Sequence, residues 1–145
     1  MPEEIIKKIG SNTLQVLDYG ERTPHAVWFE LKDAEGSTLA LLRGEIYSDI
    51  FKPDYHLKEG LPTRTKVRIT KAIHGFAEEY LRKKGVAIIS RRTNIKFGRF
   101  LVRGMGYEKV GEHGTSMDVD KNIAERTKQK TVMRKKTLPQ RQRRI

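Results

Sequence analysis

The stretch from Thr63 to Val110 decides the fold: TRTKVRITKAIHGFAEEYLRKKGVAIISRRTNIKFGRFLVRGMGYEKV. Its first part, residues 63–85, places apolar residues three and four positions apart, which predicts one buried stripe along a long helix. Gly85 suits the position just after the last helical turn. Residues 86–89 (VAII) have no polar interruption and predict a strand covered on both faces. A helix, a buried strand and a second helix in succession predict an α/β layer.

The segments before this stretch have the composition of β-strands. The runs 13–19, 26–31 and 38–47 are rich in strand-forming residues, and a loop of hairpin length that ends in Gly36 separates the last two. A further short strand is predicted at residues 55–57. We therefore expect one mixed-sheet α/β domain over residues 1–120. The positions expected to share its core are Ile73, Phe76, Tyr80, Ile88 and Leu101.

The basic charge is concentrated at the C-terminus. The chain has 145 residues and a net charge of +12, and residues 121–145 hold ten Lys and Arg against the single acidic residue Glu125. Few apolar residues interrupt this segment, which predicts an extension that a partner orders, either an acidic protein surface or DNA or RNA. The residues expected to make these contacts are Arg134, Lys135, Lys136, Arg141, Arg143 and Arg144.

Several classes of function are disfavoured by the composition. No cysteine is present, which excludes disulfides and thiolate chemistry and fits a reducing compartment such as the cytoplasm. No apolar run approaches the ~18 residues of a membrane span. No Walker loop or Ser-His-Asp order is present. The histidines have no metal-ligand spacing, so no metal site is expected; they are His25, His56, His74 and His113.

The order of long helix, buried strand, Asn94, short helix, glycine-aromatic turn and strand resembles the C-terminal half of a GNAT-type N-acetyltransferase. In that family the buried strand splays from its neighbour, an Asn opens the next helix, and that helix ends in a Leu-Tyr-x-x-x-Gly-Phe pattern. Here residues 101–107 (LVRGMGY) occupy the closing pattern, and residues 115–119 would form a last strand. The resemblance implies a GNAT-like fold trimmed at its N-terminal side, because residues 20–25 leave room only for a turn where the family has two helices.

Two functional features of that family are absent. The family holds the acyl-CoA pyrophosphate with an Arg/Gln-x-x-Gly-x-Gly/Ala loop, which lets backbone N–H groups approach the phosphates. Counting back from the end of the long helix, that loop falls on residues 65–70, and Thr65, Lys66, Arg68 and Thr70 make it a degenerate version. The tyrosine that often protonates the leaving thiolate aligns with Val102. The resemblance with these departures implies a GNAT fold that needs no cofactor.

The main expectation is therefore a non-catalytic protein that assembles with other proteins. The chain also resembles internal or assembly-associated virion proteins of short-tailed bacteriophages, at residues 66–71 and at Asn94 with residues 99–101, which implies a location in the virion or the host cytoplasm. Two alternatives stay open. One is an acetyl-CoA-dependent N-acetyltransferase in which Lys66 and Arg68 replace the glycine loop. The other is a sequence-independent nucleic-acid-binding protein.

The remaining candidates are single residues and one charged stripe. His56 and Glu45 could each act as a general base, although a loop histidine and a solvated strand glutamate are the favoured explanations of these two residues. A second basic cluster has the spacing i, i+4, i+7 and i+11, which would put its members on one helix face able to bind phosphates, or simply facing solvent. Its members are Arg92, Lys96, Arg99 and Arg103.

Overall fold

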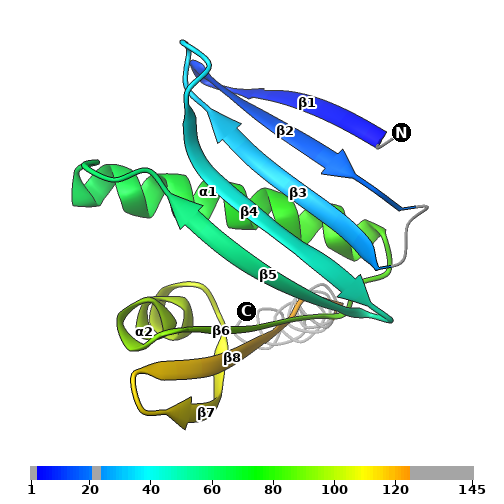
Figure 1. Cartoon of the computed structure of the whole chain (residues 1–145), viewed down its shortest axis with the longest axis vertical. Helices are drawn as coiled ribbons and strands as arrows, with labels where there is room; N and C mark the ends of the chain where they lie inside the picture. The colour runs from blue at the N-terminus through cyan, green and yellow to red at the C-terminus, as the bar shows by residue number, and fades with distance from the viewer. Residues whose placement is uncertain (1–2, 21–23, 125–145) are drawn as a thin grey trace, which may run out of the picture.

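An eight-stranded mixed sheet with two helices carries the fold of this chain (Figure 1). The computed structural model describes residues 3–20 and 24–124. The sheet order is β1-β2-β3-β4-β5-β6-β8-β7, and every neighbouring pair is antiparallel except the parallel pair β5–β6. The elements are β1 (Glu3–Ile9), β2 (Asn12–Asp18), β3 (His25–Lys32), β4 (Thr38–Tyr47), β5 (Ile50–Leu57), α1 (Thr63–Lys83), β6 (Ile88–Asn94), α2 (Ile95–Gly104), β7 (Glu108–His113) and β8 (Ser116–Asn122).

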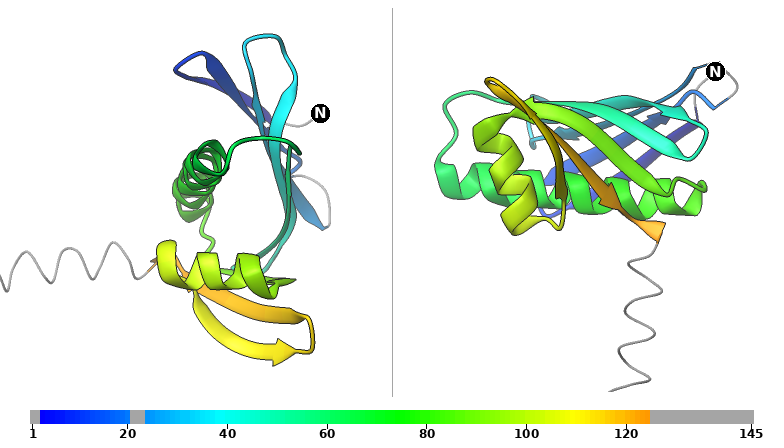
Figure 2. Two further views of the ribbon diagram at one scale, coloured as in Figure 1. Left: turned by 90° about the vertical axis from the view of Figure 1, so that its left-hand side faces the viewer. Right: turned by 90° about the horizontal axis from the view of Figure 1, so that it is seen from below.

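The first five strands have one covered face and one open face (Figure 2). Successive side chains of a strand point to opposite faces. Val27 and Phe29 of β3 are fully buried on the face that α1 covers, whereas Trp28 between them is 36% exposed on the other. We call these the covered face and the open face. The mixed-sheet α/β class with a GNAT-like element order, expected from the sequence, is confirmed.

The long helix α1 buries the apolar stripe that its sequence predicts. Ile73 of this helix is fully buried, Tyr80 is buried and its hydroxyl donates a hydrogen bond to the buried carboxylate of Asp18 in β2. Leu101 of α2 is also fully buried. These three core predictions are confirmed. Phe76 and Ile88 are only partly buried; Phe76 packs against the core, and the ammonium group of Lys7 lies 5.2 Å from the centroid of its ring.

The main differences from the sequence-based expectation lie in β1, β5, β6 and β8, and β5 begins at Ile50 rather than at residue 55. β1 was not expected, and it forms a hairpin with β2 through Gly10, which has a φ of 61°. β6 continues beyond residue 89 to Asn94. β8 continues to Asn122, and Lys121 is buried within it. Lys121 therefore belongs to the sheet rather than to the basic extension.

The basic contacts expected of that extension lie beyond the part of the chain that the structure describes. They are Arg134, Lys135, Lys136, Arg141, Arg143 and Arg144. Within residues 3–20 and 24–124, neither helix combines the length and the apolar character that a bilayer crossing requires.

Candidate active site

The parallel strands β5 and β6 pair only at their beginnings. The pairing joins Ile50 to Ile88 and Phe51 to Ile89, after which the two strands diverge (Figure 1). We call this divergence the splay. Two backbone hydrogen bonds fix which residues of β5 face it. The N–H of Lys58 donates to Leu39 of β4 at 2.8 Å, and the carbonyl of Asp49 accepts from Ala87 at 2.7 Å. Even-numbered residues of β5 therefore direct their peptide groups toward β4, and odd-numbered residues direct theirs toward the splay.

Pro53 and Gly44 fit this arrangement. Pro53 has no N–H, and because it is an odd-numbered residue its nitrogen faces the splay, so the β4–β5 ladder loses no hydrogen bond. Gly44 lies opposite Pro53. A Cβ atom on Gly44 would lie 2.4 Å from the carbonyl oxygen of Lys52 and 2.7 Å from the Cα of Pro53. Any larger residue at position 44 would therefore push β4 and β5 apart.

Side chains from four elements meet between the splay and α1. The hydroxyls of Tyr55 and Thr70 lie 2.9 Å apart, and the Nδ1 of His74 lies 2.8 Å from the carbonyl oxygen of Thr70. The Nη1 of Arg91 lies 2.8 Å from the Nε2 of His74. The ring of Phe97 stacks on Tyr55 at 5.7 Å between centroids. We call these five residues the splay cluster.

The hydrogen bonds of the splay cluster set its protonation. Burial, together with the nearby charge of Arg91, lowers the pKa of His74 to about 3. His74 is therefore neutral near pH 7, with Nδ1–H donating to Thr70 and Nε2 accepting from Arg91. Burial also raises the pKa of Tyr55, so its phenol keeps its proton.

Arg91 is the charged member of this cluster. Its side chain is 6% exposed, and its Nε has no hydrogen-bond partner. Its guanidinium lies 5.2 Å from the ring centroid of Phe97. Among the described residues, no carboxylate forms an ion pair with it. Arg91 is thus a buried cation beside a neutral imidazole, an aromatic ring and the buried hydroxyl of Tyr107.

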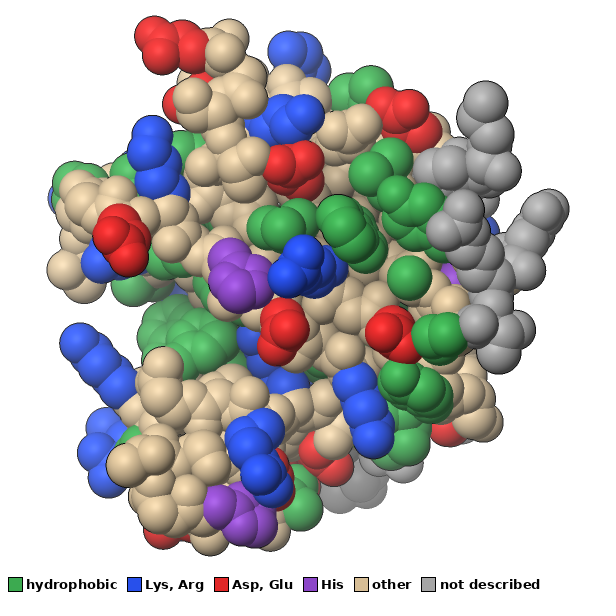
Figure 3. Space-filling model, viewed as in Figure 1, with side chains coloured by type: hydrophobic (Ala, Val, Ile, Leu, Met, Phe, Trp, Pro, Cys, Tyr) green, Lys and Arg blue, Asp and Glu red, His purple; other side chains and the backbone are tan. Residues whose placement is uncertain are grey.

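Basic side chains border the helix side of the splay. The first turns of α1 line a hollow with Arg64, Val67, Arg68 and Lys71. The outer face of α2 lines a second hollow with Ile95, Lys96, Arg99, Phe100, Arg103 and Gly104. A third hollow shares Lys71 with the first and Gly104 with the second, so the three are neighbours on the surface. We call them together the helix-side groove. In the view of Figure 3, a notch in the molecular surface has hydrophobic side chains at its base and Lys and Arg side chains along its lower edge.

The N-terminus of α1 adds to this positive character. The first intrahelical bond runs from Lys66 N to Pro62 O at 2.9 Å, so the N–H groups of Thr63, Arg64 and Thr65 have no partner within the helix. The first turn contains no acidic residue. The positive end of the helix dipole is therefore not compensated by a carboxylate of that turn.

The segment expected to be a degenerate acyl-CoA loop is not a loop. Thr65 to Thr70 lie inside α1, where the N–H groups from Lys66 onward are used by the helix. Arg68 does line the helix-side groove, but Lys66 does not, and Thr70 is buried and bonded to Tyr55. Asn94 opens α2 as expected: its side chain accepts a hydrogen bond from Phe97 N at 2.8 Å.

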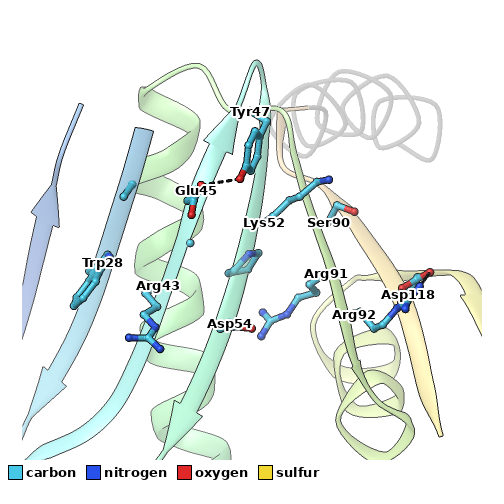
Figure 4. A pocket seen from close by; sticks show the side chains of 13 residues that line it. Trp28, Arg43, Glu45, Tyr47, Lys52, Asp54, Ser90, Arg91, Arg92 and Asp118 are labelled. Atoms are coloured by element: carbon cyan, nitrogen blue, oxygen red, sulfur yellow. Dashed lines mark hydrogen bonds and ion pairs between the residues drawn. The ribbon is translucent and has the colours of Figure 1, made fainter. Parts of the chain in front are cut away.

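The open face carries a second depression, next to the beginning of the splay (Figure 4). We call it the open-face pocket. It has a volume of about 750 Å³. Arg92 lines it from β6, where its Nε bonds Asp118 at 2.8 Å. The predicted basic stripe is therefore wrong for Arg92, which lies on a strand, and holds for Lys96, Arg99 and Arg103 on α2. The remaining lining residues are Ala26, Trp28, Arg43, Gly44, Glu45, Tyr47, Lys52, Pro53, Asp54, Ser90, Arg91 and Asp118.

The two candidate bases have different positions. Glu45 lines the open-face pocket, where it accepts a hydrogen bond from the hydroxyl of Tyr47 at 2.7 Å. His56 is an exposed residue near the end of β5, opposite Leu41, and is not among the lining residues. Of the two candidates, Glu45 therefore lies in this pocket and His56 lies outside it. Of the splay cluster, only Thr70 had a candidate role from the sequence, as part of the expected loop, and Asp54 was not singled out, since only the fold brings these residues together.

Comparison with solved structures identifies the fold. A scan against protein-family models finds no match, and neither does a search of the curated proteins. Among solved structures, the PaiA N-acetyltransferase from Thermoplasma acidophilum, in complex with coenzyme A, has a TM-score of 0.57 at 15% identity over 67% of this chain. An acetyltransferase of the GNAT family from Staphylococcus aureus has a TM-score of 0.57 at 8% identity, covering 70% of each chain. Mutant forms of the spermidine/spermine N-acetyltransferase SpeG from Vibrio cholerae have a TM-score of 0.58 at 11% identity, over 72% of this chain and 70% of theirs.

These similarities establish a GNAT-like fold. The chain spans 60% of the length of the PaiA structure. They also correct the main expectation from the sequence, which was a non-catalytic assembly protein related to phage virion proteins. The structures named above are acetyltransferases, and none is a virion or assembly protein. That expectation is wrong, and the acetyltransferase alternative fits these findings better.

Proposed function

We propose that the protein is an acyl-CoA-dependent N-acyltransferase that binds the nucleotide end of its cofactor with basic side chains instead of a glycine loop. The observation that supports this best is the splay. Beyond Phe51 the outer edge of β5 has no strand partner among the described residues, and the helix-side groove opens beside it. A strand edge with free peptide groups next to a basic groove suits a ligand with an amide-containing arm and phosphates.

The residues present are chemically suited to acetyl-CoA. Arg64, Arg68 and Lys71 on α1 would bind its phosphates from one side of the helix-side groove, together with the free N–H groups of the first turn. Lys96, Arg99 and Arg103 on α2 would do so from the other side. The outward peptide groups of β5 would hydrogen-bond the amide-containing arm. When bound, acetyl-CoA supplies an acyl group that is activated as a thioester and is transferred to an amine, with release of CoA as the thiol.

The acceptor amine would bind on the opposite side of the sheet, in the open-face pocket. Glu45 is the residue that would take the proton from this amine, since its carboxylate lines the pocket. The hydroxyl of Tyr47 donates to Glu45 and would hold its carboxylate in position. Val102 stands where the family often has a proton-donating tyrosine, so no residue of α2 is assigned to proton donation.

Calorimetric titration with CoA tests the proposal. We expect wild-type protein to bind CoA, and Arg68→Glu and Arg99→Glu each to weaken binding roughly tenfold or more, because a charge-assisted hydrogen bond contributes about 1.5–3 kcal/mol. Lys109→Glu is the matched control, since Lys109 lies on β7 and lines none of the three hollows of the helix-side groove. Absence of binding at millimolar CoA, or equal weakening by all three substitutions, would count against the proposal.

Turnover is measured in the same preparation as free thiol released from acetyl-CoA in the presence of amines. Glu45→Gln should lower the rate by roughly a hundredfold or more, the usual contribution of a general base, and leave CoA affinity unchanged. A Glu45→Gln protein with full activity would remove Glu45 from the assignment.

A further inference from the structure

The open-face pocket contains a buried positive charge that the fold does not neutralise. Arg91 is 6% exposed, lines this pocket and has an Nε without a hydrogen-bond partner. A guanidinium keeps its charge in proteins, and a buried charge without a counterion is unfavourable. The imidazole of His74 accepts one hydrogen bond from it but carries no negative charge. Arg91 therefore has the properties of a residue that awaits an anion.

Such an anion would bind between β5 and β6, beside the side chain of Arg91. The side chain of Arg91 extends from β6 into the space between β6 and β5, toward the strand that carries Asp54 (Figure 4). The neighbouring Arg92 is already paired with Asp118, at 2.8 Å and 3.3 Å. The two arginines thus differ in kind, because Arg92 has its own carboxylate and Arg91 has none among the described residues.

Carboxylates on the other wall of the pocket can bind an amine. Asp54 is exposed and has no ion-pair partner in the described part of the chain, and Glu45 is held only by the hydroxyl of Tyr47. Two aromatic rings of the pocket already have a cationic side chain of this protein beside them, so they are not available to a ligand cation. Arg43 lies 5.5 Å from the ring of Trp28, and Lys52 lies 5.6 Å from the ring of Tyr47.

The balance of charges restricts the ligand. Among the described residues, Arg43, Lys52 and Arg91 line the pocket without an ion pair, and so do Glu45 and Asp54, although Asp54 lies opposite Arg43 and Glu45 lies opposite Lys52 across the β4–β5 pair. The pocket therefore has both signs of charge, with the positive sign in excess. An acceptor with positive charges only, such as a polyamine, would leave Arg91 without its anion and would face two further cations.

We infer that the acceptor is an amine that also carries a carboxylate, such as an amino acid, and that Arg91 binds the carboxylate while Asp54 and Glu45 bind the amine. This assignment rests on the proposed acyltransferase function, whose acceptor it specifies. It concerns binding by this chain's own residues in the absence of any cofactor. Its test can therefore be separated from that of the proposed function.

The test is calorimetric or NMR titration of the cofactor-free protein with matched ligands: L-alanine and L-aspartate, each beside its α-amide, with acetate and spermidine as single-charge-type controls. We expect each amino acid to bind roughly tenfold or more tightly than its α-amide, since the amide keeps the amine and loses the carboxylate. Acetate and spermidine should both bind more weakly than the amino acids. Equal affinity of acid and amide, or stronger binding of spermidine, would overturn the inference, as would no binding of any ligand.

Arg91→Gln keeps an N–H donor for His74 and removes the charge, so it should abolish the preference for acid over amide. Arg82→Gln is the control, because it removes the same charge from the last turn of α1, outside the pocket. A preference that survives Arg91→Gln would contradict the role of Arg91. If Arg91→Gln does not fold, the inference is still tested by comparing the affinities of the wild type for acid and amide. Asp54→Asn then provides the second test, since it should weaken the binding of amino acids but not of acetate. Amino-acid binding without acyl transfer would preserve this assignment and remove the proposed function.

Discussion

His74 is the residue whose chemistry depends most on the fold. Its imidazole is 1% exposed and hydrogen-bonds at both nitrogens, to Thr70 and to Arg91. Tyr55 and Phe97 also flank it. A protonated imidazole here would face the guanidinium of Arg91 and would lose its role as acceptor. The neutral form is therefore part of the folded structure.

We predict that His74 makes the protein less stable in mild acid. Its pKa is about 3 in the folded protein against 6.5 for the unperturbed group, so between these values the unfolded chain binds a proton that the folded protein does not. The free energy of unfolding should be insensitive to this group above pH 6.5 and should fall by about 1.4 kcal/mol per pH unit below it. Denaturant unfolding of the wild type and of His74→Gln, measured from pH 7 to pH 4.5, checks this.

His74→Gln keeps a donor for Thr70 and an acceptor for Arg91 but does not titrate, so its stability should change less over the same range. The pH range of the measurement stays above pH 4 because the buried Asp18 and the Arg92-paired Asp118 also have lowered pKa values. The stability that these two carboxylates contribute is lost only at lower pH. Parallel pH curves for the two proteins would show that His74 does not titrate as expected.

Single residues were predictable where their environment is local. Asn94 could be assigned as a helix start because a cap needs only the three residues that follow it. The contact between His74 and Arg91 could not, since it joins α1 to β6 and depends on the packing of both. For the same reason Arg91 and Arg92 looked alike in the sequence, although one is buried and the other is paired on the open face.

Among the elements, α1 shows what a hydrophobic pattern fixes and what it leaves open. The apolar stripe correctly predicted a helix that ends at Lys83. A phosphate-binding loop would require α1 to begin later in the sequence, and the apolar stripe alone does not determine where the helix begins. Residues 61–74 contain no glycine, and Pro62 has a φ of −58° that suits the residue before the first turn. The helix therefore starts at Thr63 and absorbs the segment expected to be the loop.

Lys121 of β8 and Glu78 of α1 connect two elements through a buried ion pair. Their charged atoms lie 2.8 Å apart, with 7% and 6% of the two side chains exposed. We predict that Glu78→Ala destabilises the protein by about 3–5 kcal/mol, because it leaves the ammonium group of Lys121 buried without its carboxylate. Chemical denaturation measures this difference.

The double substitution Glu78→Leu with Lys121→Met is the matched control. It removes both charges and keeps apolar volume, so it should be far less destabilising than Glu78→Ala alone. If the double variant is as unstable as the single one, the loss of stability comes from lost packing around α1 and not from the buried charge.

At the scale of the whole molecule, the fold consists of two parts that share few backbone contacts. Strands β1–β5 form one part, and β6, β8 and β7 with α2 form the other (Figure 1). The two register pairs between β5 and β6 are the strand pairing between them. The Glu78–Lys121 ion pair and the Arg91–His74 hydrogen bond, both made by α1, supply side-chain connections. The helix α1 therefore holds the two parts together.

The sequence predicted the architecture better than the function. Periodicity, turn residues and the order of elements led to the mixed α/β sheet and to the GNAT-like resemblance, because each depends on local patterns. The non-catalytic expectation relied on Val102 and on the missing glycines of residues 65–70, which are departures from a family pattern. A binding groove depends on charges that α1 and α2 bring together from distant positions, such as Arg68 and Arg99, and a linear motif does not contain that information.

Pro53 and the alternation along β5 have a consequence for isotope exchange. The amide hydrogens of Asp54 and His56 lie in the ladder with β4, whereas those of Tyr55 and Leu57 point into the splay, where no described residue accepts them. In deuterated water we therefore expect Tyr55 and Leu57 to exchange much faster than Asp54 and His56, as amide-resolved NMR would record. A ligand whose amides bind the free edge of β5 should slow the first two and leave the others unchanged, while uniform exchange rates along β5 would mean that its outer edge is already covered.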